Sequence, residues 1–206
     1  EELLLAEADN RVTNVVRGLV HSGIHPGDRV AVVMGSRPSF LSMVTALSRL
    51  GAVAVLIPPD ATPPVLRDVV RSVGVRACAT DPQYAGLCLE ALTETPAADG
   101  ASAPRLERKI LVLGGGGGLR KLAPGLVDME AIDPRAVELP PSFRPNPGVG
   151  SDVALVLCRP SDRGGLRAVE VTNHRWALSA LGAAAACTLK PDDTVYCAIP
   201  LHHPAG

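Results

Sequence analysis

A run of basic and small residues near the carboxyl end of the chain has the composition of an anion-binding loop. It combines guanidinium groups, a hydroxyl and two glycines, contributed by Arg159, Ser161, Arg163, Gly164, Gly165 and Arg167. Backbone N–H groups in such a loop can point at phosphate oxygens, and an arginine can close the cradle with paired hydrogen bonds. An ordinary exposed hairpin with solvated arginines is the alternative interpretation of these residues.

The elements around this run would hold it at the end of a buried strand. Residues 153–158 and 168–171 predict two strands that flank it. Thr172 or Asn173 then caps a helix, because both side chains can accept a hydrogen bond from the first helical turn. Residues 194–199 predict a last strand after that helix.

Two adjacent histidines near the end of the chain, His202 and His203, follow Cys197 closely and suggest a metal site. Neighbouring residues in an extended segment point to opposite sides, so the two imidazoles rarely share one ion. The five cysteines are odd in number and show no close spacing. We therefore expect no metal site, and we expect reduced thiols that serve as small core residues.

Five consecutive glycines, residues 114–118, follow a predicted strand and suggest a dinucleotide-binding loop. That motif needs glycine at its first, third and sixth positions and a helix directly afterwards. Here the sixth position is Leu119, and Pro124 opposes a helix. The glycines therefore predict a flexible connection, which continues as mostly irregular chain to residue 150.

The chain before the glycines predicts an α/β fold with a doubly wound, mostly parallel sheet. Apolar strands alternate with amphipathic helices, a pattern that favours right-handed βαβ units with helices on both faces. The expected strands are residues 29–34, 52–57, 75–79 and 109–113, and the expected helices are residues 3–20, 38–50, 62–73 and 83–92. Hydrophobic residues make up 47% of the 206 residues, enough to bury a core of this kind.

Charge and hydropathy exclude several classes of partner. The 20 basic and 21 acidic residues give a net charge of -1, without the basic excess of nucleic-acid or anionic-membrane binders. The longest apolar stretch, residues 177–189, is too short to cross a bilayer, and no secretory signal opens the chain. We expect a cytoplasmic protein. Its bias toward Ala, Gly, Pro and Arg suggests a GC-rich bacterial genome.

Three pairs of segments follow one another in the order of a known set of motifs. They are residues 8–12 with 23–32, residues 36–40 with 50–58, and residues 193–196 with 200–206. The first two resemble the opening helices and strands of the adenylate-forming enzymes, the superfamily of acyl-CoA synthetases, luciferases and peptide-synthetase adenylation domains. The third resembles that family's segment ending in Pro-Leu-aromatic-His-x-x-Gly.

The resemblance covers nearly the whole chain and implies a partial N-terminal domain of such an enzyme over residues 1–206. Residues 1–113 would form the βαβ sheet region, and residues 114–150 the Gly/Pro-rich connection. Residues 151–206 would contain the phosphate loop, a helix and the start of the acyl pocket.

The resemblance also implies which residues bind ligands. The family's phosphate loop, typically Thr-Ser-Gly-Thr-Thr-Gly-x-Pro-Lys-Gly, aligns with residues 159–168, where Gly164 is retained and Arg167 replaces the lysine. The implied ATP contacts are Arg159, Ser161, Arg163, Gly164, Gly165, Arg167 and Thr172. The implied acyl-pocket residues are His203 and Gly206. Because the loop has lost most of the family's residues, we expect it to bind ATP weakly.

The implied activity is a two-step ligation. A fatty acid or other carboxylate attacks the α-phosphorus of Mg-ATP to give an acyl-adenylate and pyrophosphate, and the thiol of CoA then displaces AMP. We therefore expect part of a long-chain fatty-acid-CoA ligase, with ATP, Mg2+ and CoA as the parent family's cofactors, that is inactive as residues 1–206 alone. The alternative is a non-catalytic relative that keeps the fold for acyl-group binding or protein contact.

Overall fold

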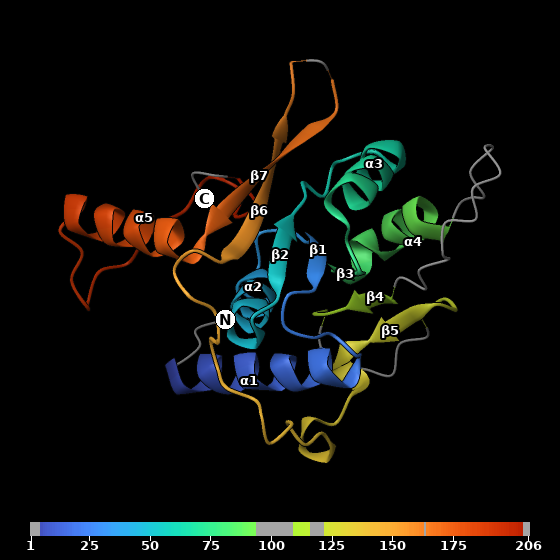
Figure 1. The fold of residues 1–206 in the computed structure, drawn as a ribbon, viewed down its shortest axis with the longest axis horizontal. Helices are drawn as coiled ribbons and strands as arrows, with labels where there is room; N and C mark the ends of the chain where they lie inside the picture. Colours follow the sequence, from blue (N-terminus) through green and yellow to red (C-terminus); the bar gives the residue numbers. More distant parts are fainter. Residues whose placement is uncertain (1–4, 94–108, 116–121, 163, 204–206) are drawn as a thin grey trace.

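One seven-stranded sheet runs through the middle of the molecule (Figure 1). The computed structural model describes residues 5–93, 109–115, 122–162 and 164–203. The strands are β1 (Arg29–Val33), β2 (Val53–Leu56), β3 (Ala77–Thr80), β4 (Lys109–Val112), β5 (Leu126–Asp128), β6 (Val153–Pro160) and β7 (Leu166–Thr172). Their order across the sheet is β5-β4-β3-β1-β2-β6-β7. Neighbouring strands are parallel, except that β6 and β7 are antiparallel.

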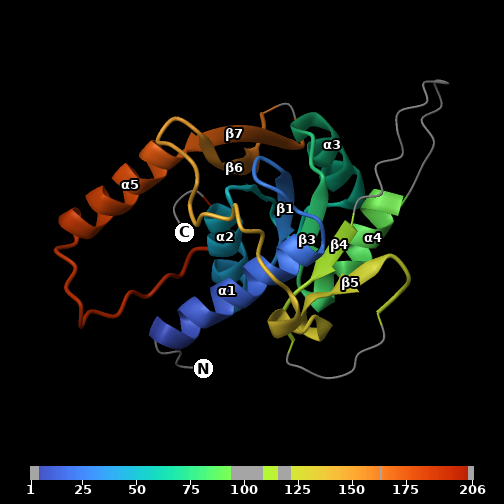
Figure 2. The ribbon, with the colours of Figure 1, turned by 60° about the horizontal axis from the view of Figure 1, so that its bottom comes forward.

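Helices cover both faces of this sheet, which confirms the doubly wound α/β prediction (Figures 1 and 2). Helices α1 (Leu5–His21) and α2 (Pro38–Leu50) pack on one face, and α3 (Pro63–Val73) and α4 (Ala85–Thr93) pack on the other. A short 3₁₀ turn, η1 (Pro82–Tyr84), precedes α4. Among the helices that the structure describes, none has the length and apolar character of a membrane span.

The central strand β1 shows why the strands are apolar without interruption. Val30 and Val32 join the core formed with α1 and α2, whereas Ala31 and Val33 join the core formed with α3 and α4. All four side chains are 0% exposed. Successive side chains of a strand point to opposite faces, so a strand covered on both faces needs apolar residues at every position.

Pro38 and Gly51 set the two ends of α2. Proline suits the first helical turn, where its fixed φ is helical and no N–H is needed. Gly51 ends the helix with a φ of 79°, in the left-handed region. A Cβ atom at Gly51 would lie only 2.6 Å from Cγ of Pro147. The end of α2 therefore requires glycine for two reasons, its backbone angle and this close approach.

The connection between β4 and β6 is more regular than the sequence predicted. It contains β5, which pairs with β4, and the 3₁₀ turns η2 (Met129–Ala131) and η3 (Pro134–Ala136). The carboxylate of Glu130 accepts hydrogen bonds from the N–H of Gly114, at 2.9 Å, and from Arg11, at 3.3 Å. The prediction of mostly irregular chain is correct for the rest of the described connection but missed these elements, because a three-residue strand is too short to show a periodic pattern. The rest of the glycine run, within residues 116–121, lies outside the described residues.

The last helix, α5 (Asn173–Ala186), leads away from the sheet, and the chain then returns beside α2 (Figure 2). The hydroxyl of Thr172 accepts a hydrogen bond from the N–H of Arg175, which confirms the predicted cap. The strand predicted for residues 194–199 was wrong, since these residues pair with no other strand in the described part of the chain. Val195 and Tyr196 are 68% and 89% exposed, so β-forming side chains alone did not produce a strand there.

Candidate functional site

The carboxyl ends of the parallel strands meet at the edge of the sheet from which the β6–β7 hairpin projects (Figure 1). From β1 the chain passes through α2 to β2 on one side, and from β3 it passes through α4 to β4 on the other. In open α/β sheets, ligands bind in the crevice where the connections part in this way. The loops that follow β1 and β3 are therefore the first candidates for a site.

Asp81, directly after β3, links these two loops. Its carboxylate accepts hydrogen bonds from the N–H of Gly35, at 2.7 Å, and from the hydroxyl of Ser39, at 3.4 Å, and the residue is only 1% exposed. Nearer the surface, the guanidinium of Arg37 donates to the side-chain oxygen of Gln83 at 2.9 Å. The chain's own side chains thus occupy the crevice between β1 and β3.

The predicted phosphate loop is the turn of the antiparallel β6–β7 hairpin. The N–H of Ser161 donates to the carbonyl of Gly165 at 3.1 Å, and the N–H of Gly164 donates to the carbonyl of Ser161 at 2.9 Å. Pro160 has no N–H to offer. Gly164 and Gly165 both have positive φ, at 82° and 72°, which the tight turn requires. Two backbone N–H groups of the turn, those of Ser161 and Gly164, are therefore used within the turn itself.

Arg159 and Arg167 are the two arginines of the predicted phosphate loop that the structure describes. They lie directly opposite each other in the β6–β7 pairing, so both side chains project on the same face, with Cβ atoms about 5 Å apart. Both residues are exposed. Two arginines at facing positions of a hairpin are able to bind one anion between them. Arg163, the third arginine of the predicted loop, lies outside the described residues.

Thr172 is at the opposite end of the hairpin from the turn. It pairs with Val153 at the start of β6, roughly 20 Å along β7 from Leu166. Its hydroxyl caps α5. The structure therefore does not bring Thr172 together with Arg159 and Arg167, and an ATP contact for this residue stays a prediction.

Residues 200–203, which we call the histidine segment, return to the same edge of the sheet. The N–H of Leu201 donates to the hydroxyl of Ser36, after β1, at 3.0 Å, and the Leu201 side chain packs against the core that includes α1 and α2. His202 is half-buried, whereas His203 is exposed and its N–H donates to the carbonyl of Pro200 at 2.8 Å. Gly206 lies outside the described residues.

The environment of His202 favours its neutral form. Partial burial lowers the pKa of His202 below its ordinary value, the nearby Asp60 carboxylate opposes this shift, and His203 adds to it. Asp60 follows β2, the strand between β1 and β6. The histidine segment therefore lies across the ends of β1 and β2.

The arginine pair and the histidine segment lie on one face of the sheet. Leu155 and Val171 face each other four pairs along the hairpin from Arg159 and Arg167, and they belong to the core with α1 and α2. Because side chains alternate along a strand, Arg159 and Arg167 project on that same face. Leu201 packs on it as well. Arg159 and Arg167 thus lie at the same edge and on the same side of the sheet as the histidine segment.

Three of the five cysteines are buried, away from solvent. Burial raises the pKa of Cys158 to about 12. Cys78 and Cys88 are buried with their sulfur atoms 3.6 Å apart, and this contact together with burial raises the pKa of Cys78. Cys187 and Cys197 are exposed, so the prediction that the thiols serve as core residues was correct for three of the five and wrong for these two. Among the described residues, no cluster of three or more His, Cys, Asp or Glu side chains could hold a metal ion.

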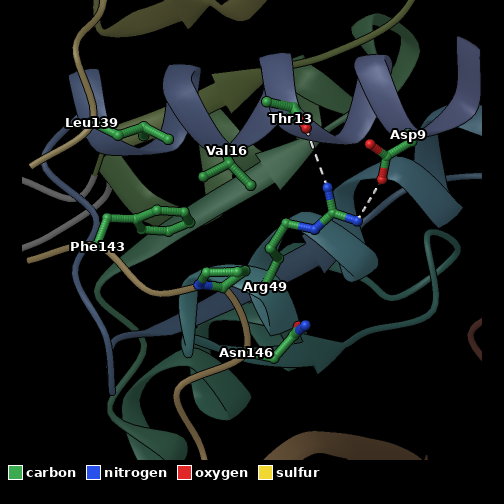
Figure 3. A pocket seen from close by; sticks show the side chains of 8 residues that line it. Asp9, Thr13, Val16, Arg49, Leu139, Phe143 and Asn146 are labelled. Carbon is green, nitrogen blue, oxygen red and sulfur yellow. Dashed lines mark hydrogen bonds and ion pairs between the residues drawn. The ribbon is translucent and has the colours of Figure 1, made fainter. Parts of the chain in front are cut away.

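Two clefts lie away from this edge. One, of about 350 Å³, opens between α1, α2 and the connection at residues 139–146 (Figure 3). The guanidinium of Arg49 crosses it and donates to Asp9 at 2.8 Å and to Thr13 at 3.2 Å. The other, of about 470 Å³, lies at the amino ends of β1, β2 and β6. In the first cleft, the Arg49 guanidinium is already hydrogen-bonded to side chains of α1. The candidate site is therefore the one at the carboxyl ends of the strands.

The chain belongs to the family of AMP-binding enzymes, whose pattern it matches over residues 3–139. This match confirms the resemblance to the adenylate-forming enzymes. Long-chain fatty acid transport protein 1 of Mus musculus is 28% identical to it over 200 residues, which cover 96% of this chain and 28% of that protein. The protein of the same name from Rattus norvegicus is 26% identical over 205 residues, covering 98% of this chain and 29% of that protein. The chain thus spans less than a third of these relatives.

Solved structures of this family share the fold. A putative long-chain-fatty-acid CoA ligase from Rhodopseudomonas palustris aligns over 98% of this chain and 46% of its own, with a TM-score of 0.74 and 16% identity. An O-succinylbenzoate coenzyme A synthetase from Bacillus subtilis, solved with ATP and a magnesium ion, aligns with the same coverage, a TM-score of 0.72 and 16% identity. At this identity the likeness establishes the fold alone.

The sequence reasoning missed Ser36 and Asp81. Both follow strands of the parallel sheet, and residues just beyond such strand ends gather at one edge. That rule, applied to each polar residue after a predicted strand, would have selected both of them. It would also have selected Asp60, after β2.

Proposed function

We propose that this chain is part of an ATP-dependent acyl-CoA synthetase that acts on long-chain fatty acids. Its membership of the AMP-binding family and its similarity to long-chain fatty acid transport protein 1 support this proposal. The observation that carries it furthest is the joint placement of the Arg159/Arg167 pair and the histidine segment at one edge of the sheet. An acyl-adenylate has an anionic phosphate beside an acyl group, and these two sets of residues match its two parts.

The roles of the chain's own residues follow from their chemistry. Arg159 and Arg167 would neutralise a phosphate, since paired guanidinium groups bind its oxygens in a bidentate manner. His203 would lie beside the carboxylate of the acyl substrate. Adenylate formation depends largely on such positioning and charge stabilisation. When bound, ATP supplies the phosphorus atom that the carboxylate attacks, and CoA supplies the thiol of the second step.

We further propose that residues 1–206 bind ATP weakly. Relative to the family's typical loop, residues 159–168 lack two or three donors, since Pro160 has no N–H and Ser161 alone carries a hydroxyl. Hydrogen bonds to charged oxygens contribute about 1.5–3 kcal/mol each, so the loss amounts to roughly 3–9 kcal/mol. Arg159 and Arg167 return part of it. Since 1.4 kcal/mol is about tenfold in affinity, we expect ATP to bind at least a hundredfold more weakly here than to the family's typical loop.

Calorimetry with Mg-ATP tests this expectation. The chain should show no binding at micromolar concentrations. A dissociation constant in the low micromolar range, lost in Arg167→Ala but kept in the control Arg135→Ala, would contradict the expectation and indicate an arginine-based cradle. Arg135 is an exposed arginine in η3, far along the chain from the hairpin.

The internal hydrogen bonds of the hairpin turn also favour a second function. In this case the protein is a non-catalytic relative that uses the fold to bind an acyl group or another protein. ATP–pyrophosphate exchange on the full-length protein, with a panel of fatty acids of increasing length, separates the two. Exchange that depends on a long-chain acid supports the synthetase. Binding of the acid without any exchange supports the non-catalytic relative.

A further inference from the structure

Ser36 lies at the point where the histidine segment meets the sheet. Its hydroxyl accepts a hydrogen bond from the N–H of Leu201 at 3.0 Å, across 165 residues of sequence. Ser36 is itself exposed, so it does not serve the core. Serine hydroxyls on a surface usually bond to water or to a neighbouring turn, whereas this one fixes the backbone of a distant segment.

The loop that carries Ser36 is held rigidly from below. Gly35, its neighbour, donates its N–H to the buried carboxylate of Asp81 at 2.7 Å. Such a charge-assisted hydrogen bond is stronger than a neutral one, and burial of Asp81 shields it from water. Arg37, on the other side of Ser36, is linked to Gln83 at 2.9 Å. The loop after β1 is thus linked to the loop after β3 on both sides of the serine.

We infer that Ser36 is a positioning residue that docks the histidine segment on the sheet, and that Asp81 supports it through Gly35. Side chains at a reacting centre act only when they are held to within a fraction of an ångström, which requires a rigid support behind them. Asp81, Gly35, Ser36 and Leu201 form a continuous series of contacts from the buried sheet to the two histidines. The functional meaning of this series rests on the proposed acyl-CoA synthetase activity, but the docking itself does not.

The docking can be tested on the chain alone by removal of one oxygen atom. In Ser36→Ala, amide hydrogen exchange at Leu201 should accelerate about two- to tenfold, the effect of one lost hydrogen bond. The pKa of His202, followed by NMR, should move up toward its ordinary value because the segment leaves its partly buried position. Ser36→Thr keeps the hydroxyl and should restore both values.

Ser42→Ala is the matched control, since that hydroxyl bonds within α2 to the carbonyl of Pro38 at 3.0 Å. It should leave Leu201 and His202 unchanged. Unchanged exchange at Leu201 in Ser36→Ala would overturn the inference, and so would equal changes in Ser42→Ala. In the full-length protein, Ser36→Ala should raise KM for the fatty acid at least threefold and leave KM for ATP unchanged. If the full-length protein forms no adenylate while Leu201 responds as expected, the docking stands and the proposed function fails.

Discussion

His202 and His203 are adjacent in sequence but differ in their surroundings. His202 is half-buried near Asp60, and His203 is exposed at the same edge. The family motif places its histidine at His203, so the residue expected to meet substrate is also the one that solvent reaches. His202 instead contributes to the packing of the segment. The pair therefore combines one docking residue and one candidate substrate residue.

The lowered pKa of His202 makes the docking dependent on pH. When the segment is undocked, His202 has its ordinary pKa near 6.5, so it takes up a proton there more readily than in the docked state. Docking should therefore be complete above about pH 7 and should weaken as the pH falls through and below 6.5. The Asp60 carboxylate attracts the protonated ring and limits the effect. Exchange at the Leu201 amide, corrected for its intrinsic rate, should accelerate between pH 7.5 and 5.5, and His202→Gln should remove this dependence.

Substitution of the two histidines in the full-length protein tests their separate roles. His203→Ala should weaken use of the fatty acid about tenfold or more and leave ATP binding within twofold, as expected for a residue at the acyl carboxylate. His202→Ala should cost less, because it loosens the segment without removing the contacting group. Steady-state kinetics with each substrate varied in turn would show this. Equal losses at both positions would mean that the pair is purely structural.

At the scale of whole elements, the ends of helices depend on glycines that differ in their surroundings. Gly51 and Gly74 both end helices with positive φ, but an added Cβ atom would clash with Pro147 at Gly51 and would meet nothing at Gly74. Gly86 lies within α4 with an open environment. Substitutions at these three glycines therefore distinguish the free-energy cost of a left-handed backbone angle from the cost of a steric clash.

The same substitution at the three glycines should therefore have graded effects on the free energy of unfolding. Gly74→Ala should cost about 1–2 kcal/mol, the penalty for a left-handed residue with a Cβ. Gly51→Ala should cost more, about 2–4 kcal/mol, because Pro147 must also move. Gly86→Ala should be neutral or stabilise by up to about 1 kcal/mol. Urea denaturation measures all three, and equal costs at Gly51 and Gly74 would show that Pro147 yields freely.

The elements that the sequence predicted correctly are those whose pattern is local. Continuous apolar residues predicted β1, and Pro38 with Gly51 predicted the limits of α2. The three-residue strand β5 was missed, because it is too short for a pattern of its own and is defined by its pairing with β4. The reverse error occurred at residues 194–199, where β-forming side chains found no partner strand in the described part of the chain. Strand pairing is a property of two segments, and one segment's composition does not determine it.

The candidate site was only partly predictable for the same reason. The hairpin and the histidine segment were found as separate motifs, but their common edge and face depend on the β2–β6 pairing. The internal hydrogen bonds of the Ser161–Gly165 turn depend on its three-dimensional path. Ser36 acts through a residue 165 positions away, which no local pattern reveals.

At the scale of the whole molecule, two cores of different composition lie on the two faces of the sheet. The core with α1 and α2 also receives Trp176 and Leu201, so the described residues after β7 that reach a core pack on that face. The core with α3 and α4 contains the buried thiols. Both cores include residues of β6, but among the described residues after β7 only the core that faces the candidate site gains further members.

The sheet order has a consequence for the time course of folding. Paired residues of β1 and β2 are 24 positions apart in the sequence, as in the pairing of Arg29 with Val53. Paired residues of β2 and β6 are about 100 positions apart, as in the pairing of Ala54 with Leu155. Segments that are distant in sequence lose more conformational entropy when they meet, and this loss precedes the stabilisation that their contacts provide. The β1–β3 unit should therefore gain protected amides first, with β6 and β7 joining later, in a pulsed hydrogen-exchange experiment. The anion-binding face would then come into existence as the final event of folding, so a newly made chain holds a completed scaffold before it can engage any ligand.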